Sequence, residues 1–285
     1  MIIVTGATGQ LGRAIVEQLT ARLPATQVGA SVRDPEKAAD LEALGVRVRQ
    51  GDFRDPASLT HAFEGATQVL MVSSNARAYG GDPLAQHRAA IGAAREAGAT
   101  RIVYTSQMAA SPSSAFAPAL DHAATEELLR QSGLAWTALR NGFHATSSLF
   151  MLGDSLDTGL FEAPADGPVA WTTHADLAEG AAAILTDPGR FEGPTPPLTG
   201  SQALDFADLT GLASEVLGRP VERRVISDED FSARMAARGA PGNHLLGMYR
   251  ASRAGEFATV DGALEQLIGR PALTMRDVLA QKFGR

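Results

Sequence analysis

The chain has 285 residues, of which 45% are hydrophobic and 20% charged, and its formal net charge is −7. This composition is typical of a globular protein that forms one large α/β unit, alone or with a small lobe. The acidic balance and the lack of a Lys/Arg cluster disfavour nucleic acid as a partner. Because the sequence contains no cysteine, disulfides and cysteine nucleophiles are excluded, and redox chemistry requires a bound cofactor.

The N-terminal segment MIIVTG lacks the basic and long apolar regions of a secretory signal. No run approaches the roughly 18 apolar residues of a membrane span. The six histidines form no cluster with Asp or Glu at ligand spacing, so we expect no metal. The sequence therefore predicts a cytoplasmic protein without a membrane span.

The first half of the chain alternates short β-branched runs with longer amphipathic or Ala-rich runs, which is typical of a parallel sheet with crossover helices. Six strands are predicted, at 2–5, 27–32, 46–50, 68–73, 101–106 and 135–140. Helices are predicted at 11–22, 35–44, 56–64, 83–97 and 122–132. This order predicts an α/β fold with a Rossmann-type doubly wound sheet.

After residue 142 the segments between helices become longer and irregular. Helices are predicted near 175–186, 205–217, 228–238, 261–268 and 274–282. We expect a Rossmann domain over 1–142 and a smaller C-terminal α+β lobe over 143–285. Whether some elements of this lobe return to the Rossmann sheet is left open.

The stretch TGATGQLG places Gly6, Gly9 and Gly12 between the first predicted strand and a helix. Glycines in this context let the backbone turn sharply, approach a pyrophosphate and pack the helix on the sheet. The spacing is GxxGxxG, not GxGxxG, and the alternative is a purely structural turn. We interpret the loop as a dinucleotide site, and the cofactor residues predicted in it are Gly6, Ala7, Thr8, Gly9, Gln10 and Leu11.

The second strand ends in SVRDP, so Arg33 stands where an acidic residue would bind the ribose 2′-hydroxyl of NAD. A guanidinium at this position suits a 2′-phosphate, which favours NADPH over NADH. In the alternative reading Arg33 is solvated and Asp34 binds the ribose. After the third strand, Asp52 and Phe53 are predicted to lie beside the adenine. Asp52 could equally be the N-cap of the helix that begins near Pro56.

Several motifs resemble those of the NmrA-like, atypical short-chain dehydrogenases, most closely the type 2 NAD(P)H:quinone oxidoreductases. The similarity runs nearly end to end, and the segments that carry it include TGATGQLG at 5–12, QGDFRD at 50–55, YTS at 104–106, TEELLRQSGLAWTALRNG at 125–142, THADLAEGAA at 173–182 and LIGRPALTM at 267–275. The resemblance implies an NADP-binding domain followed by a lobe that covers the substrate.

Short-chain dehydrogenases in general use a Tyr and a Lys on the helix before the sixth strand, and this chain lacks that pair. The resemblance places Pro118 at the Tyr position and His122 at the Lys position. Ketone reduction needs general acid help and is disfavoured. A quinone yields a delocalised hydroquinone anion, so holding its ring against the nicotinamide in a water-poor slot would supply much of the catalysis. We therefore expect hydride transfer from NADPH to a quinone or similar conjugated acceptor.

The resemblance also implies roles for polar residues at strand ends. Ser73, Ser74 and Asn75 would contact the nicotinamide ribose and diphosphate. The end of the sixth strand would flank the nicotinamide through Thr137, Arg140, Asn141 and Gly142. In the alternative interpretation, residues 73–75 are an ordinary loop start and Asn141 is a turn residue before Gly142.

Asn141 is the preferred partner for the carboxamide or for a substrate oxygen, and Ser106 occupies the usual catalytic serine position. His122 would orient the substrate or lend a proton, and His174 would touch the cofactor, unless both are solvated helix starts. Phe143 and His144 are expected to wall a flat aromatic substrate pocket, although apolar residues at such spacing usually belong to a core.

Two other functions remain open at this point. Some NmrA-like proteins bind NADP without catalysis and report redox state to a partner, and the missing Tyr and Lys suit such a regulator equally well. A third reading is reduction of an azo or triphenylmethane dye. The small-residue run AAIGAAREAGA is compatible with a homodimer or with packing on the sheet.

Overall fold

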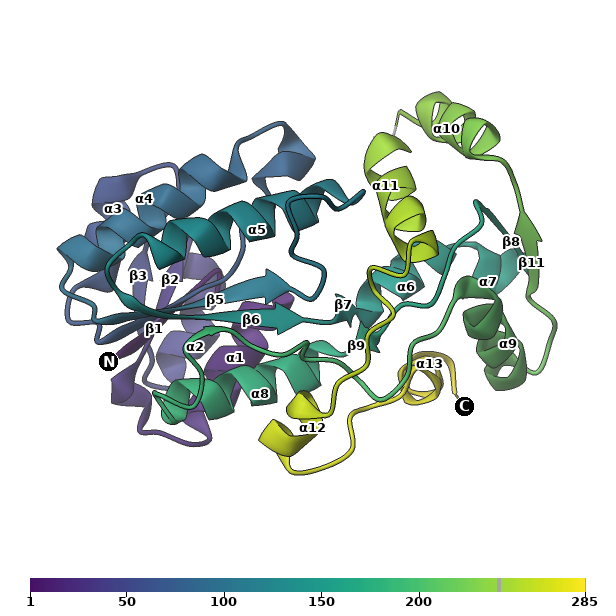
Figure 1. Ribbon diagram of the computed structural model, residues 1–285. Helices are drawn as coiled ribbons and strands as arrows, with labels where there is room; N and C mark the ends of the chain where they lie inside the picture. Colours follow the sequence, from purple (N-terminus) through teal and green to yellow (C-terminus); the bar gives the residue numbers. More distant parts are fainter. Residues whose placement is uncertain (240–241, 285) are drawn as a thin grey trace.

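A seven-stranded parallel sheet lies at the centre of the molecule in the computed structural model, which describes residues 1–239 and 242–284 (Figure 1). Its strand order is β10-β6-β5-β4-β1-β2-β3. The strands are β1 Ile2–Thr5, β2 Val28–Val32, β3 Arg47–Gln50, β4 Gln68–Met71, β5 Arg101–Gln107, β6 Ala135–Asn141 and β10 Gly193–Pro194. The predicted Rossmann-type fold and its six strands are confirmed. The seventh strand was missed because two residues ending in proline carry no recognisable strand pattern.

Helices cover both faces of this sheet. In Figure 1, α3 Pro56–Phe63, α4 Pro83–Glu96 and α5 Ala117–Arg130 lie on one face. The other face is covered by α1 Gln10–Thr20, α8 His174–Thr186 and α12 Ala263–Ile268, and α1 and α12 both pack on α8. Residues of α1, α8 and α12 share one hydrophobic core, so α8, β10 and α12 return from the second half of the chain to the Rossmann sheet.

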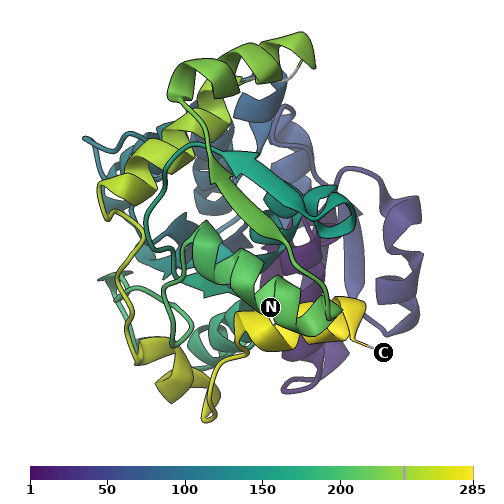
Figure 2. The same ribbon diagram turned by 90° about the vertical axis from the view of Figure 1, so that its right-hand side faces the viewer.

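The rest of the C-terminal half forms a second layer with its own core. Two small parallel pairs organise it, β7 Phe143–His144 with β9 Trp171–Thr172 and β8 Leu160–Ala163 with β11 Glu222–Val225. Its helices are α6 Ala145–Leu152, α7 Ser155–Thr158, α9 Phe206–Leu217, α10 Asp228–Ala237, α11 Gly242–Arg253 and α13 Met275–Phe283. Figure 2 looks onto this lobe and shows β8 and β11 with α10 above them and α9 below.

The predicted helices of the C-terminal half correspond to α8, α9, α10, α12 and α13, whereas α6, α7 and α11 were not predicted. Helices α6 and α7 are too short for a helical period to stand out. Among the described residues no helix is both long and apolar enough to cross a bilayer.

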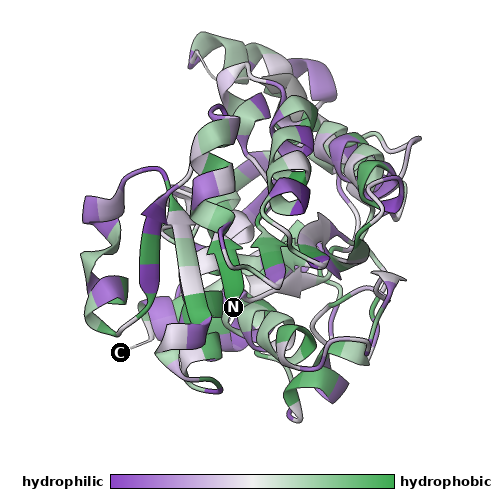
Figure 3. Ribbon diagram, turned by 90° about the vertical axis from the view of Figure 1, so that its left-hand side faces the viewer, coloured by the Kyte–Doolittle hydropathy of each residue, from purple (hydrophilic) through white to green (hydrophobic). Residues whose placement is uncertain are grey.

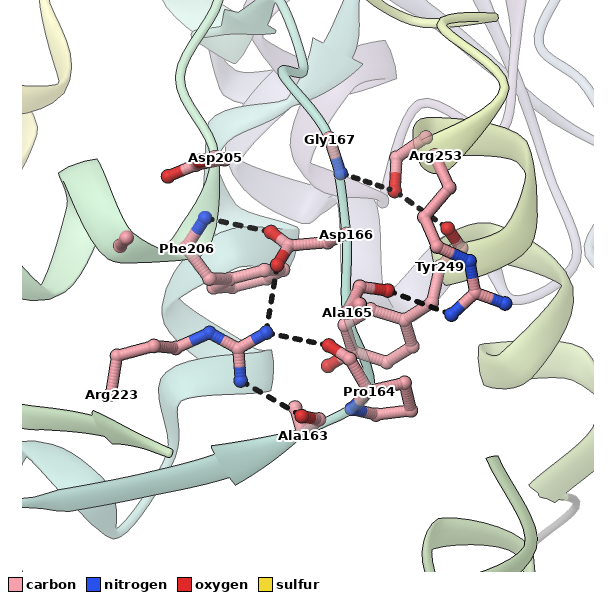
Figure 4. A network of polar contacts seen from close by, with 12 residues as sticks. Ala163, Pro164, Ala165, Asp166, Gly167, Asp205, Phe206, Arg223, Tyr249 and Arg253 are labelled. Carbon is pink, nitrogen blue, oxygen red and sulfur yellow. Dashed lines mark hydrogen bonds and ion pairs between the residues drawn. The ribbon is translucent and has the colours of Figure 1, made fainter. Parts of the chain in front are cut away.

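A buried ion pair between Arg223 and Asp166 joins the β8–β11 pair to α9 (Figure 4). The Arg223 guanidinium lies 2.7 Å from Asp166 Oδ1 and also donates to the carbonyls of Ala163 and Pro164 at 2.9 and 2.5 Å. Asp166 Oδ2 accepts the backbone N–H of Phe206, the first residue of α9, at 2.8 Å. The side chains of the ion pair are 9% and 8% exposed, so their hydrogen bonds compensate for lost hydration.

The edge strand β3 carries hydrophilic side chains beside the apolar inner strands (Figure 3). Arg47 and Arg49 donate to the carbonyls of Glu64 and His61, at 2.7 and 2.6 Å, near the end of α3. Charged side chains on an edge strand oppose pairing with another sheet. The open edge of the sheet is therefore protected against pairing. The candidate site lies elsewhere, at the carboxyl ends of the strands.

Candidate functional site

The loop between β1 and α1 requires glycine at two positions. Gly6 has φ +61°, a conformation that L side chains rarely adopt. A Cβ added to Gly12 would lie within 2.4 Å of the Gly6 carbonyl oxygen, so only glycine lets the helix pack this close to the loop. Gly9 caps α1 without a side-chain hydrogen bond, and no acidic residue occupies the first turn. The N-terminal amides of α1 therefore remain available to an anion.

A cavity of about 590 Å³ lies in front of this loop and extends over the ends of β2, β3 and β4. Its lining includes Gly6, Thr8, Gly9, Arg33, Asp52, Phe53, Ser73, Ser74 and Asn75, all of which were predicted to bind the cofactor. Of the remaining loop residues, Ala7 is buried, while Gln10 and Leu11 form the first turn of α1. The size and position of the cavity, at the carboxyl end of a doubly wound sheet, fit a dinucleotide.

The Arg33 guanidinium is exposed at the end of β2 and has no hydrogen-bond or ion-pair partner among the residues that the structure describes. Asp34 is occupied elsewhere, because it caps the 3₁₀ helix Pro35–Ala38 and lies 3.3 Å from Lys37. An unpaired guanidinium at this rim fits a 2′-phosphate.

The Asp52 carboxylate also lies at this rim and binds the side chain of Arg54 at 2.7 Å. This hydrogen bond and the charge of Arg54 hold the pKa of Asp52 below its usual value. The N-cap of α3 is Asp55, which accepts the N–H of Ser58 at 3.3 Å. The alternative reading of Asp52 as the helix cap is therefore wrong.

Three consecutive backbone amides after β4 are each fixed by a side chain from another element. The amides of residues 72–74 donate to Thr5 Oγ1, Thr105 Oγ1 and His87 Nε2 at 2.9, 2.8 and 2.8 Å. Thr5 and Thr105 lie in β1 and β5, on either side of β4 in the sheet. Residues 72–74, which follow β4 and line the larger cavity, are therefore each held by a hydrogen bond to a side chain of another element.

His87, which the sequence reasoning missed, is 1% exposed at the start of α4. Because its Nε2 accepts a backbone N–H, Nδ1 carries the proton and donates to Thr125 Oγ1 at 2.8 Å. Thr125 in turn donates to the Asp121 carbonyl at 2.7 Å. Burial lowers the pKa of His87 to about 4, so the ring is neutral near pH 7. The available sequence signal was a lone histidine within an Ala-rich predicted helix.

A second recess, of about 210 Å³, shares residues 73–75 with the larger cavity. Pro118 and His122 of α5 both line it, at the positions where the general dehydrogenase pattern has Tyr and Lys. Tyr104 of β5 also lines it and places Oη 2.8 Å from His122 Nδ1. Burial lowers the pKa of His122 to about 3. A tyrosine hydroxyl therefore does reach this region, from β5 and not from α5.

The end of β6 holds an unsatisfied polar atom. Asn141 is 2% exposed, and its Oδ1 has no hydrogen-bond partner within the described part of the chain. Its backbone carbonyl accepts the N–H of Met108 at 2.9 Å. Next to it, a Cβ on Gly142 would lie 2.2 Å from Thr172 Oγ1. Asn141 lines neither cavity, but a buried amide oxygen without a partner fits a donor supplied by a ligand, such as a carboxamide.

Three predicted site residues instead have structural partners. Ser106 donates to Glu126 at 2.6 Å, and Arg140 binds the same carboxylate at 2.7 Å. Thr137 donates to the Phe191 carbonyl at 2.7 Å and lies near the start of β6, away from its carboxyl end. None of these three side chains lines either cavity.

The predicted substrate residues lie on the second layer. Phe143 packs edge-on against Trp171 and Phe257, with ring centroids 5.4 and 5.1 Å apart, and belongs largely to the core of the lobe. The rings of His144 and His174 lie 4.4 Å apart. Burial, with His174 and His122 nearby, lowers the pKa of His144 to about 3. His122, His144 and His174 thus form one group of histidines.

No group of three His, Asp or Glu side chains that could hold a metal ion occurs among the described side chains, those of residues 1–239 and 245–284.

Comparison with known proteins agrees with this geometry. A family model described as NAD(P)H-binding matches residues 6–188. The chain is 37% identical to quinone oxidoreductase 2 of Escherichia coli (strain K12), over 99% of both chains. The crystal structure of an NADPH-dependent quinone oxidoreductase from Escherichia coli in complex with NADPH matches with a TM-score of 0.91 and 35% identity, over 99% of this chain and 100% of that one. A triphenylmethane reductase from Citrobacter sp. in complex with NADP(H) matches with a TM-score of 0.88 and 33% identity, over 99% of each chain.

Proposed function

Because the chain belongs to the NAD(P)H-binding, NmrA-like family of oxidoreductases, we propose that it uses NADPH to reduce a quinone or a similar conjugated acceptor. The observation that carries the proposal is the cavity of about 590 Å³, which joins the glycine loop to the unpaired Arg33. The similarity to an NADPH-dependent quinone oxidoreductase over the full length supports the same reaction.

The glycine loop, the α1 N-terminus and Arg33 would hold the phosphates of the cofactor. The amides of α1 suit the diphosphate, and Arg33 suits the 2′-phosphate through charge-assisted hydrogen bonds. Asp52 already holds Arg54, so it leaves Arg33 free for this role. The residues present therefore fit NADPH better than NADH.

Asn141 and His122 are the residues that we assign to the reacting end. The unpaired Asn141 Oδ1 would accept a hydrogen bond from the nicotinamide carboxamide and so orient the ring. His122 would face the acceptor from the recess. Bound NADPH supplies a hydride, and a proton from solvent completes the two-electron reduction of the quinone to the hydroquinone.

A quinone suits this site because the described residues of the recess include no strong general acid. Burial raises the pKa of Tyr104 far above its usual value, and the histidine next to it is neutral. A delocalised hydroquinone anion needs only hydrogen bonds and solvent to be protonated. The second layer, which contains β8, β11 and α11, would limit the access of water to the acceptor.

The proposal is tested by following NADPH absorbance at the nicotinamide band with and without 1,4-benzoquinone. We expect oxidation only with the quinone. Arg33→Asp should lower kcat/KM for NADPH by roughly 10-fold or more, the equivalent of one charge-assisted hydrogen bond, and leave NADH little changed. Arg88→Asp is the matched control, because Arg88 is an exposed arginine on α4 that lines neither cavity. Tight binding of NADPH without turnover of any acceptor would show a redox-sensing regulator instead.

A further inference from the structure

The geometry of the recess points to a new role for a tyrosine. We propose that Tyr104 locks His122 in the tautomer protonated on Nε2, and that this N–H donates a hydrogen bond to the carbonyl oxygen of an acceptor bound in the recess. Tyr104 is then a positioning residue, and His122 sets a preference for acceptors that carry an oxygen. The inference rests on the proposed function and identifies the acceptor class by its hydrogen-bonding atom.

The recess lies between the 3₁₀ helix Ala76–Tyr79 and α5. Its volume of about 210 Å³ is several times the roughly 30 Å³ that one water molecule occupies in the liquid, which leaves space for a flat ring. The bidentate ion pair of Arg77 with Asp121, at 2.5 and 2.6 Å, ties the two walls together. Because residues 73–75 border both cavities, a ring in the recess would adjoin the cofactor.

The proton of the Tyr104 hydroxyl decides the tautomer of His122. Tyr104 is fully buried, and a buried hydroxyl needs a hydrogen-bond partner. Its Oη lies 2.8 Å from His122 Nδ1 and also interacts with the Thr125 hydroxyl, which contacts His87 Nδ1 and donates to the Asp121 carbonyl. Since burial raises the pKa of Tyr104, Oη keeps its proton, and in the arrangement that we propose it donates this proton to Nδ1. His122 must then carry its own proton on Nε2.

The Nε2 atom of His122 has no hydrogen-bond partner among the described residues, and the side chain lines the recess. The titratable groups packed around it are His87 on α4, His144 after β6, Asp121 on α5 and Tyr104 on β5. Asp121 is neutralised by Arg77, and the histidines are uncharged near pH 7. His122 therefore offers an uncharged N–H to the recess.

An uncharged donor stabilises negative charge as it develops on a quinone oxygen, without itself losing a proton. The same donor contributes nothing to a cationic triphenylmethane dye, which accepts hydride on carbon and develops no negative charge on an oxygen. The donor thus favours one acceptor class over the other. The ratio of the two activities isolates this effect from any general loss of cofactor binding.

The test compares NADPH oxidation with 1,4-benzoquinone and with a triphenylmethane dye in the wild type, His122→Phe, His122→Gln and Tyr104→Phe. We expect His122→Phe to lower kcat/KM for the quinone by roughly 10- to 100-fold and to change dye reduction less than threefold. His122→Gln, which keeps an N–H, should recover part of the loss, and Tyr104→Phe should show an intermediate loss.

Equal losses for both acceptors, or no loss, would overturn the inference, whereas a wild type inactive towards every quinone would overturn the proposed function.

A spectroscopic measurement tests the tautomer without any turnover. In ¹⁵N NMR spectra of the histidine rings near pH 7, His122 should show an unprotonated Nδ1 and a protonated Nε2, and Tyr104→Phe should shift the ring towards a mixture of tautomers. An unchanged thermal unfolding transition and NADPH affinity would show that the variant is folded. A protonated Nδ1 in the wild type, or no response to Tyr104→Phe, would refute the lock.

Discussion

The buried His87 makes a sharp prediction about stability and pH. Burial lowers the pKa of His87 from 6.5 to about 4 in the folded chain. As the pH falls below 6.5, the unfolded chain takes up a proton that the folded chain does not take up until about pH 4. The stability that the neutral ring contributes is therefore complete above pH 6.5 and is lost as the pH falls towards 4. The difference of about 2.5 pKa units corresponds to roughly 3 kcal/mol, or about 1.4 kcal/mol per pH unit.

The assay is urea unfolding at pH 7, 6 and 5 of the wild type and of His87→Gln, in which the amide oxygen can still accept the Ser74 N–H. We expect the stability advantage of the wild type to shrink by about 1.4 kcal/mol per pH unit below pH 6.5. His144 and His174 are present in both proteins and cancel in the comparison, whereas the pKa of His122 depends in part on His87. His61→Gln is the control, because the His61 side chain is 63% exposed. A pH-independent difference between wild type and His87→Gln would refute the reasoning.

Three further substitutions test the glycine loop, the buried ion pair of the second layer and the end of β6. Gly12→Ala should weaken NADPH binding at least 10-fold by titration calorimetry, because the new Cβ would meet the Gly6 carbonyl at 2.4 Å, whereas Gly92→Ala, with no described atom within 4 Å of its Cβ, should bind normally. Arg223→Met should cost about 3–5 kcal/mol of unfolding free energy in urea, because Asp166 would keep a buried charge without its partner; a loss below 1 kcal/mol would contradict this. Asn141→Ala should lower kcat for quinone at saturating NADPH by roughly 10-fold, and an unchanged kcat would remove Asn141 from the site.

The sequence predicts the sheet well because each strand of the first half is a compact β-branched run followed by a helix of ordinary length. Gly6 and Gly12 mark the cofactor loop because both positions exclude a side chain for local reasons. Arg33 could be proposed as a cofactor residue because it follows the glycine loop at the usual separation in a βαβ unit, at the end of the second strand. These features are set by neighbours in the sequence or by one crossover connection.

The recess could not be predicted in this way. Tyr104, His87 and His122 come from β5, α4 and α5, and their rings meet only when α4 and α5 pack on the same face of the sheet. Every residue from Arg101 to Ser106 is buried, so β5 shows no alternation that would reveal which way Tyr104 points. The partners of Ser106, Arg140 and Thr137 are likewise distant in the sequence, and strand-end position alone does not separate structural from functional hydroxyl groups.

The distribution of charge across the site follows from this architecture. Arg33 and the α1 N-terminus provide positive potential at the phosphate end, where affinity is needed. At the other end His87, His122 and His144 are all neutral because burial lowers their pKa values. Hydride transfer leaves a positive charge on the nicotinamide ring, and protonated histidines beside it would oppose that charge in a medium of low dielectric constant. Neutral histidines would not repel the positive nicotinamide ring. In our proposal the N–H of His122 would still stabilise the oxygen of the acceptor. In the function that we propose, the fold would bind the anionic part of the cofactor with charge and its reacting part with dipoles.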